Sequence, residues 1–395
     1  MIGNGISNVG SWMQLVAQPW LVLTLSGSSF LVGVDNFAGH VPSFLFLILG
    51  GVYADRKSRR QIMVVSQIVQ LVSAALIAGL LVWGKIQVWM IIALSFCVGT
   101  AQAFSFPAYQ ALVTTLVPRE YLPNAIALNS VVFNMTRVIG PMLAGVTMAA
   151  IGAAWCFGLN SLSFIALLIV LFQIETSQPT KSALQSPAGA SAKVGSWHEG
   201  LNKVYRDKPM LVTLLLVFIV TSFCGPVFSF LPVIVKNMIH GNASTFSHSA
   251  ALFGVGALFG ALGIAALNLS NARSLTLKLL LLLAALEAGV AFTSQVWILN
   301  ILLFITGAAF VACTTAANTS LQTSTTNEFR GRTASFFLLS MRAGMALGSL
   351  LSGWAIDQMG VKIAFTANAV IAIVFGLGAW RLVNTAGVRQ INQPE

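Results

Sequence analysis

Charged side chains are scarce in this sequence of 395 residues. Lysine, arginine, aspartate and glutamate together make up 8% of it, and hydrophobic residues make up 57%. A soluble domain carries about 25% charged residues, so this chain has too little polar surface to face water on all sides. The composition therefore excludes a soluble globular protein and predicts an integral membrane protein.

The sequence also lacks the motifs of common enzymes and cofactor-binding proteins. It contains no Walker loop for ATP, no zinc-ligand spacing, and no nucleophile paired with a base in a recognisable motif. We therefore expect no enzymatic activity, no cofactor and no metal site. The four cysteines lie in apolar runs without a Cys-x-x-Cys pair, which predicts small packing residues: Cys97, Cys156, Cys224 and Cys313.

Long apolar runs are abundant. A membrane span needs roughly 20 apolar residues, and we count twelve such runs. Lipid offers the backbone no hydrogen-bond partners, so each run should be a helix. The runs cover residues 3–25, 30–53, 61–83, 87–116, 121–150, 153–173, 210–236, 246–269, 275–294, 296–325, 329–358 and 362–383.

The two halves of the sequence resemble each other. One shift of 208 residues aligns identical residues in the fourth and fifth runs with those in the tenth and eleventh. We therefore predict an all-α membrane protein with twelve transmembrane helices in two pseudo-symmetric six-helix bundles. The shift aligns Gly99 with Gly307, Ala101 with Ala309, Ala108 with Ala316, Glu120 with Glu328, Gly140 with Gly348 and Gly145 with Gly353.

A polar segment separates the two predicted bundles. We expect an amino-terminal bundle at 1–173, a linker at 174–209, a carboxy-terminal bundle at 210–384 and a tail at 385–395. Within the linker, the sequence Ser196-Trp197-His198-Glu199 has the spacing of a capping box. An apolar stripe follows, so a short amphipathic helix along the membrane surface is expected there.

The net charge of +11 does not require a nucleic-acid partner. Basic residues that orient membrane helices collect in cytoplasmic loops. If the loop at 51–60 is cytoplasmic, sixteen lysines and arginines share its side, and Lys85, Lys236 and Lys362 are on the other. This distribution places both termini, the linker and the tail in the cytoplasm.

The densest charge cluster is Gly51-Val52-Tyr53-Ala54-Asp55-Arg56-Lys57-Ser58-Arg59-Arg60. Its spacing, Gly-x-x-x-Asp-Arg-x-x-Arg-Arg, resembles the loop between the second and third helices of major facilitator superfamily transporters. The resemblance implies that Asp55 contacts the start of the eleventh helix, where backbone amides carry a partial positive charge. Arg330 and Arg332 would be added partners, and the contact would act as a gate with Gly51 allowing close helix approach.

The basic residues of this loop have a second interpretation. Arg56, Arg59 and Arg60 either take part in the gate or anchor the loop on lipid phosphates. A loop anchored on lipid phosphates does not need an acidic residue, so the gate is the better interpretation of Asp55.

A second motif is Arg137-Val138-Ile139-Gly140-Pro141-Met142-Leu143-Ala144-Gly145. It resembles the fifth-helix signature of major facilitator antiporters. Gly140, Pro141 and Gly145 permit close packing and a bend. Arg137 costs at least about 2.5–3.5 kcal/mol within a span, so it should face the bundle interior or water.

Arg342 lies within the eleventh run and aligns with Asn134 under the 208-residue shift. It is therefore less than one helical turn out of register with Arg137. Either both arginines attract an acidic group of a substrate, or each caps carbonyls or pairs within its own half. The sequence does not decide between these alternatives.

Coupling to protons requires a carboxylate whose ionisation changes with conformation. Asp35 is one candidate, although a solvated loop acid is the favoured interpretation of it. His40 either shares a proton with Asp35 or is a hydrogen-bonded packing residue. Glu287 lies deep in the ninth run, which is peripheral in this family, so a structural pair with a neighbouring helix is favoured.

Uncharged polar residues form one face of the first predicted helix. Asn4, Asn8, Ser11, Gln14 and Gln18 follow one another at helical steps. Such a face lines a substrate cavity or forms hydrogen bonds between helices; the cavity is favoured here. The candidate cavity residues are Asn8, Gln14, Gln18, Gln102, Tyr109, Asn134, Asn318 and Arg342.

Two further stretches narrow the resemblance within the superfamily. Residues 7–14 (SNVGSWMQ) and 124–130 (NAIALNS) resemble the enterobactin-exporter and macrolide-efflux branch. This resemblance implies a bacterial inner-membrane exporter of a small drug-like or siderophore-like molecule, which exchanges substrate for protons by alternating access. Uptake by symport and a non-transporting membrane sensor are the alternatives, and the glycine-proline motif in the fifth run counts against symport.

The expected partners are a small-molecule substrate, protons and the lipid bilayer, and we expect a monomer. The proton gradient, rather than a cofactor, would supply the energy. No cleavable leader precedes the first run, so we expect no secretory signal peptide. Related transporters usually begin with a short basic segment, so we expect such a leader to be missing from this chain.

Overall fold

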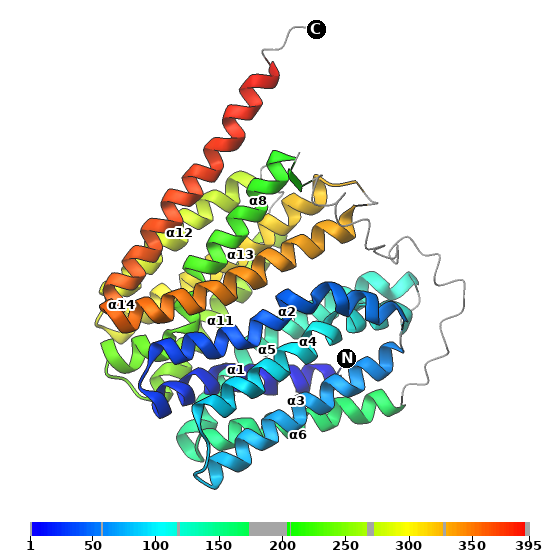
Figure 1. Ribbon diagram of the computed structural model, residues 1–395, viewed down its shortest axis with the longest axis vertical. Coiled ribbons are helices and arrows are strands. Elements are labelled where there is room, and N and C mark those ends of the chain that lie inside the picture. Colours follow the sequence, from blue (N-terminus) through cyan, green and yellow to red (C-terminus); the bar gives the residue numbers. More distant parts are fainter. Residues whose placement is uncertain are drawn as a thin grey trace.

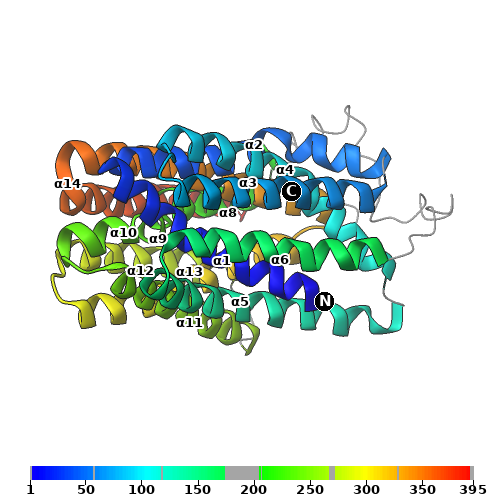
Figure 2. The same ribbon diagram turned by 90° about the horizontal axis from the view of Figure 1, so that it is seen from below.

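Helices form the whole fold, with no β-strand in the part of the chain that the structure describes. The structure is a computed structural model. The helices lie side by side along one common direction (Figures 1 and 2). This confirms the predicted all-α class. The described residues are 2–56, 58–116, 119–173, 204–205, 207–266, 272–326 and 329–391.

The first half of the chain forms six long helices. Glycines at positive φ separate several of them: Gly27 (φ 68°), Gly84 (φ 66°) and Gly152 (φ 94°). Glycine adopts this left-handed conformation without steric cost, so the chain can turn sharply there. The helices are α1 (Ile2–Ser26), α2 (Ser29–Arg56), α3 (Arg59–Val82), α4 (Val88–Leu116), α5 (Leu122–Ala150) and α6 (Ala153–Gln173).

The second half begins with an irregular segment. Asp207 caps α8 (Lys208–Ile219) by accepting a hydrogen bond from the Met210 amide at 3.1 Å. A π-helical turn at Val220–Cys224 then leads to the short helices α9 (Pro226–Ser229) and α10 (Leu231–Val233) and a second π-helical turn. Pro226 is the first residue of α9, and Pro232 lies in α10. Proline has no N–H to donate, so each of the two interrupts the series of α-helical hydrogen bonds.

Four long helices complete the second half. They are α11 (Ala243–Ala266), α12 (Ala272–Phe292), α13 (Val296–Thr323) and α14 (Arg330–Ile391). Gly360 (φ 81°, ψ 164°) breaks α14 into two helical stretches. The second stretch continues to Ile391, past the predicted end of the last run at residue 383.

Eight helices within the described ranges are long and apolar enough to cross a membrane, with α14 counted once. The predicted number of twelve spans therefore stays a prediction, as do the domain limits. Val204 and Tyr205 are helical, but the rest of the predicted surface helix lies outside the described residues.

Glycines aligned by the internal repeat make equivalent contacts in the two halves. Gly99 of α4 lies against the backbone of Gly39 in α2. Its counterpart Gly307 in α13 lies against the backbone of Phe253 in α11. A side chain at either glycine would collide with a backbone oxygen, so both helix pairs depend on glycine for their close approach.

The second aligned pair joins the two halves. Gly145 of α5 packs on Ser247 of α11, and Gly353 of α14 packs on Gly33 of α2. The pairs α5 with α11 and α2 with α14 thus form two pseudo-symmetric seams, and α14 is seen beside α2 in Figure 1. These contacts support the predicted pseudo-symmetry of the fold.

The two ends of the bundle differ in how the halves meet. We call the end with the turns at Gly27, Gly152 and Gly360 the Gly27 end, and the opposite end, where α6 ends and α8 begins, the linker end. At the Gly27 end, buried side chains from both halves form one hydrophobic cluster. Trp20 of α1 stacks on Phe246 of α11 there, with ring centroids 5.3 Å apart.

At the linker end the buried clusters belong to single halves. One contains Ile62, Leu112 and Leu171, all from the first half. Another contains Met210 and Leu321 from the second half, together with Val204 of the linker segment. The described core therefore joins the halves at the Gly27 end and keeps them separate at the linker end.

Candidate functional site

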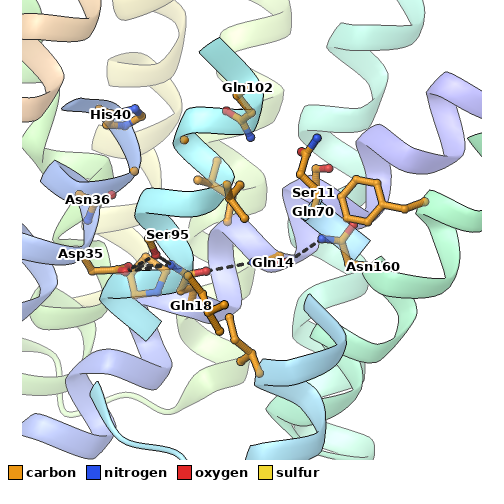
Figure 3. A pocket seen from close by; sticks show the side chains of 18 residues that line it. Ser11, Gln14, Gln18, Asp35, Asn36, His40, Gln70, Ser95, Gln102 and Asn160 are labelled. Atoms are coloured by element: carbon orange, nitrogen blue, oxygen red, sulfur yellow. Dashed lines mark hydrogen bonds between the residues drawn. The ribbon is translucent and has the colours of Figure 1, made fainter. Parts of the chain in front are cut away.

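A polar cavity lies in the first half, among α1, α2, α3, α4 and α6 (Figure 3). Five residues predicted as cavity or proton-coupling candidates line it: Gln14, Gln18, Asp35, His40 and Gln102. Three of the five residues in the polar face predicted for the first helix therefore line this cavity: Ser11, Gln14 and Gln18.

Asp35 is the acidic group of this cavity. It lies within α2, and its side chain is only 3% exposed. Gln18 Nε2 donates to Oδ2 at 2.8 Å and lies 3.1 Å from Oδ1, and Ser95 Oγ donates to Oδ1 at 2.5 Å. The favoured interpretation of Asp35 as a solvated loop acid is wrong, because the residue is buried inside a helix.

A chain of amides connects Asp35 to the far wall of the cavity. Gln14 Nε2 donates to Gln18 Oε1 at 3.1 Å, and Asn160 Nδ2 donates to Gln14 Oε1 at 2.6 Å. Ser163 Oγ donates to the Asn160 backbone carbonyl at 2.7 Å and lies 3.2 Å from Asn160 Oδ1. Every donor in the chain points toward Asp35, so the amide dipoles of α1 and α6 are aligned on its carboxylate (Figure 3).

Above this network, His40 and Arg342 bring the two halves together. Arg342 Nη1 of α14 lies 3.2 Å from His40 Nδ1 of α2. Arginine has only donors, so Nδ1 accepts and carries no proton in this contact. The contact described for His40 is therefore with Arg342 rather than with Asp35, and Arg342 reaches the opposite half.

A carboxylate that the sequence did not single out also crosses between the halves. Asp357 of α14 accepts from Ser28 Oγ at 2.5 Å, from the Ser29 amide at 2.7 Å and from the Phe30 amide at 3.1 Å. These groups form the start of α2, where unpaired amides carry partial positive charge. Asp357 thus caps a helix of the other half at the Gly27 end.

Comparison with known protein families decides the identity. A family model described as transmembrane secretion effector matches residues 1–389. The chain belongs to this family. Membership and the relatives below confirm the prediction of a major facilitator transporter of the efflux and siderophore branch. They also confirm the prediction that the protein is a transporter rather than an enzyme.

Individual relatives agree with this assignment along nearly their whole length. The transporter is 25% identical to the multidrug efflux pump Tap of Mycolicibacterium fortuitum, over 94% of this chain and 92% of that protein. It is 25% identical to the staphyloferrin A transporter of Staphylococcus aureus, over 92% of this chain and 90% of that protein. The crystal structure of nucleoside transporter NupG has the same fold, with a TM-score of 0.75, 12% identity and 97% of each chain covered.

The predicted antiporter motif of the transporter packs against α1 and α11. The Arg137 guanidinium lies over the Trp12 ring, 5.2 Å from its centroid, which is a cation–π contact within the first half. Gly140 packs on Trp12, Pro141 is buried, and Gly145 packs on Ser247 across the halves. Packing thus accounts for the glycines, and the antiporter role of the motif stays a prediction.

The predicted gate lies partly outside the described residues. The contacts of Gly51 and the side chains of Asp55 and Arg56 belong to that part, so the gate contact stays a prediction. Arg59 is half-buried and Arg330 is exposed.

The two gate arginines with described partners make local contacts. Arg60 Nη2 donates to the Phe172 carbonyl at 2.9 Å, within its own half. Arg332 lies 4.9 Å above the ring centroid of its neighbour Phe329. Contacts of this kind fit an anchor at the helix end as well as a gate.

Other predicted cavity residues lie elsewhere. Tyr109 Oη accepts from Asn4 at 3.0 Å and donates to Asn129 at 2.7 Å, so it connects three helices. Asn8 and Asn318 are half-buried and are not among the residues that line the described cavity. The side chain of Asn134 lies outside the described part.

Glu287 of α12 is fully buried in the second half. Its Oε1 accepts from Asn368 Nδ2 at 3.4 Å, and Asn368 also donates to Ser352 at 2.9 Å. This arrangement matches the structural pair with a neighbouring helix that the sequence favoured. Its part in proton coupling remains an untested prediction.

Proposed function

We propose that this transporter exports a small drug-like or siderophore-like molecule across the bacterial inner membrane in exchange for protons. The observation that carries the proposal is the buried carboxylate of Asp35 at the wall of the polar cavity. Its described partners are uncharged, and an ionisable side chain within a membrane is costly enough to mark an ion or substrate pathway. The names of Tap and the staphyloferrin A transporter support the substrate class.

The orientation follows from the basic residues. The linker end is cytoplasmic, because sixteen lysines and arginines belong to its loops, the linker and the termini. The Gly27 end then faces the outside. With that orientation, the shared hydrophobic core at the Gly27 end closes the outer side, as expected of an inward-facing state.

Transport proceeds by alternating access. In the outward-facing state the substrate leaves and Asp35 takes up a proton from outside. In the inward-facing state the proton leaves to the cytoplasm, and a new substrate binds beside the ionised carboxylate and the amides of Gln14, Gln18 and Asn160. Coupling requires only that the substrate binds more tightly when Asp35 is ionised than when it is protonated.

Two matching contacts hold the ends closed in turn. At the Gly27 end, Asp357 near the break in α14 caps the start of α2. At the linker end, Asp55 near the end of α2 caps the start of α14, with Arg330 and Arg332 as added partners. Each contact joins one carboxylate to one helix N-terminus. In one contact α14 supplies the carboxylate and α2 the N-terminus, and in the other contact the two helices have the opposite roles.

Transport into inverted membrane vesicles tests the proposal. A growth screen of a strain without the transporter selects the compound, and an imposed pH gradient drives its movement. Uptake into inverted vesicles opposite to the proton flux is the expected result. Movement in the same direction as the protons would support symport, and no movement of any selected compound would support a sensor.

A further inference from the structure

The hydroxyl of Ser95 lies between two possible acceptors. Ser95 Oγ is 2.5 Å from Asp35 Oδ1 and 3.0 Å from the Ile91 carbonyl oxygen, one turn earlier in α4. Gln18 Nε2 donates to the same Oγ at 2.7 Å. A serine hydroxyl has one hydrogen and two lone pairs, so it can donate to only one of the two acceptors at a time.

The ionised form of Asp35 uses one of these arrangements. An ionised carboxylate only accepts hydrogen bonds. Ser95 then gives its hydrogen to Oδ1, while Gln18 gives one hydrogen to Oδ2 at 2.8 Å and the other to Ser95 Oγ. Hydrogen bonds to a charged acceptor are about twice as strong as neutral ones, so this arrangement stabilises the ionised form.

The protonated form uses the other arrangement. A proton from a hydronium ion in the cavity forms the Oδ1–H bond and leaves a neutral water behind. Oδ1–H now donates to Ser95 Oγ, and Ser95 turns its own hydrogen to the Ile91 carbonyl. Gln18 keeps both of its hydrogen bonds, so every polar group is satisfied in both states without movement of a heavy atom.

We infer that Ser95 is a positioning residue for proton transfer at Asp35, through rotation of its hydroxyl between Asp35 and the Ile91 carbonyl. This inference rests on the proposed function, because it specifies how the proton-carrying group of that function is served. Without the hydroxyl, the ionised form loses one donor at Oδ1, and the protonated form loses its acceptor.

The other charged groups around α2 have separate partners. From α14, Arg342 contacts His40, and Asp357 caps the start of α2. Arg60 of α3 binds the Phe172 carbonyl at the linker end. The groups that contact Asp35 from α1 and α4 are Gln18 and Ser95, which are uncharged, so hydroxyl rotation is the response available next to the carboxylate.

A purely structural role is the competing explanation. Serines in helices commonly donate to the carbonyl one turn back and contribute only local packing. Ser105 provides the matched comparison: it is buried in the same helix, and its hydroxyl lies 3.4 Å from the Gln102 carbonyl. Replacement of Ser105 by alanine removes the same atom without touching Asp35.

Infrared titration of the purified full-length protein in lipid nanodiscs tests the inference without a transported compound. The carboxyl band that disappears in Asp35→Asn reports the protonation of Asp35. Ser95→Ala is expected to raise the midpoint of that band by about one to two pH units, since a hydrogen bond to the ionised form is lost. Ser95→Thr, which keeps the hydroxyl, and Ser105→Ala are expected to titrate like the wild type.

The outcomes separate the inference from the proposed function. A wild-type midpoint in Ser95→Ala, with the Asp35 band present, overturns the role of Ser95 and leaves proton coupling at Asp35 intact. Absence of any titrating band that Asp35→Asn removes overturns both. A midpoint that moves equally in Ser95→Ala and Ser95→Thr also overturns the hydroxyl mechanism, because it points to packing.

Discussion

Among the residues that the structure describes, each half of the transporter contains one buried carboxyl group, and the two groups have different surroundings. Asp35 in the first half lines a polar cavity and accepts hydrogen bonds from Gln18 and Ser95. Glu287 in the second half has no exposed surface, and its one oxygen accepts a long bond from Asn368. Its other oxygen has no hydrogen-bond partner among the described residues, and the Cys224 thiol lies beside the carboxyl group.

Under the proposed function, burial alone does not distinguish a proton-coupling carboxyl group from a structural one. A group that exchanges protons needs a route to water in at least one state, and it needs partners that suit both of its charge states. Asp35 has a cavity and a hydroxyl that can donate or accept. Glu287 has an apolar surrounding and an amide that is already bound to Ser352.

The largest effect is expected from Asp35→Asn. The amide keeps the size of the carboxyl group but cannot carry the proton, so transport driven by a pH gradient should fall to the level of empty vesicles. The melting temperature should stay near that of the wild type, because Gln18 and Ser95 can still bond the new side chain. Vesicle transport measured over a range of pH checks this, and an unchanged pH profile would assign coupling to another group.

A smaller effect is expected from Asp357→Asn, which removes a carboxylate that joins the halves but lies outside the cavity. The charge at the start of α2 contributes about 1 kcal/mol to the closed Gly27 end, roughly a fivefold change in population. Spin labels at Trp89→Cys and Trp297→Cys, in a Cys97→Ser background, should show longer distances in the variant. These two tryptophans are exposed at the Gly27 end of opposite halves.

The control for this experiment is Asp207→Asn. Asp207 also caps a helix, but that helix belongs to its own half. Its loss should therefore leave the distances between the labels unchanged. Equal distances in Asp357→Asn and the wild type would remove Asp357 from the closing contact.

The smallest effect is expected from Glu287→Gln. A neutral amide of the same shape should keep the wild-type pH profile of transport and change the free energy of unfolding by no more than about 1 kcal/mol. Paired measurement with Asp35→Asn in the same vesicles makes the contrast direct. A pH profile of transport that is shifted in Glu287→Gln would show that this buried carboxyl group does exchange protons.

The sequence predicted much of the fold because its signals are strong and periodic. Apolar runs located the helices, and the repeat at 208 residues aligned glycines whose contacts recur in both halves, as at Gly99 and Gly307. The polar face of α1 led to Gln14 and Gln18 in the cavity. These features depend on helical periodicity, which sequence alone expresses well.

Other parts of the site have no periodic signal. Ser95 and Asn160 are single polar residues in otherwise apolar helices, and only the packing of α4 and α6 on α1 brings them to Asp35 and Gln14. Asp357 was missed because its partners are backbone amides at the opposite end of the chain, which every helix start offers. The sequence favoured a solvated Asp35 because the residue lies near the end of an apolar run. Position along a run does not show whether neighbouring helices cover a side chain, and here they do.

The glycine seam between α2 and α14 has a practical consequence for capturing the opposite conformation. Gly33 lies against the Ser349 carbonyl and the Gly353 Cα, so a methyl group at Gly33 has no room while the Gly27 end is closed. The backbone cannot yield as a flexible side chain would. The added methyl group of Gly33→Ala therefore disfavours the conformation in which the Gly27 end is closed. Crystals or cryo-EM particles of this variant would be enriched in the outward-open conformation.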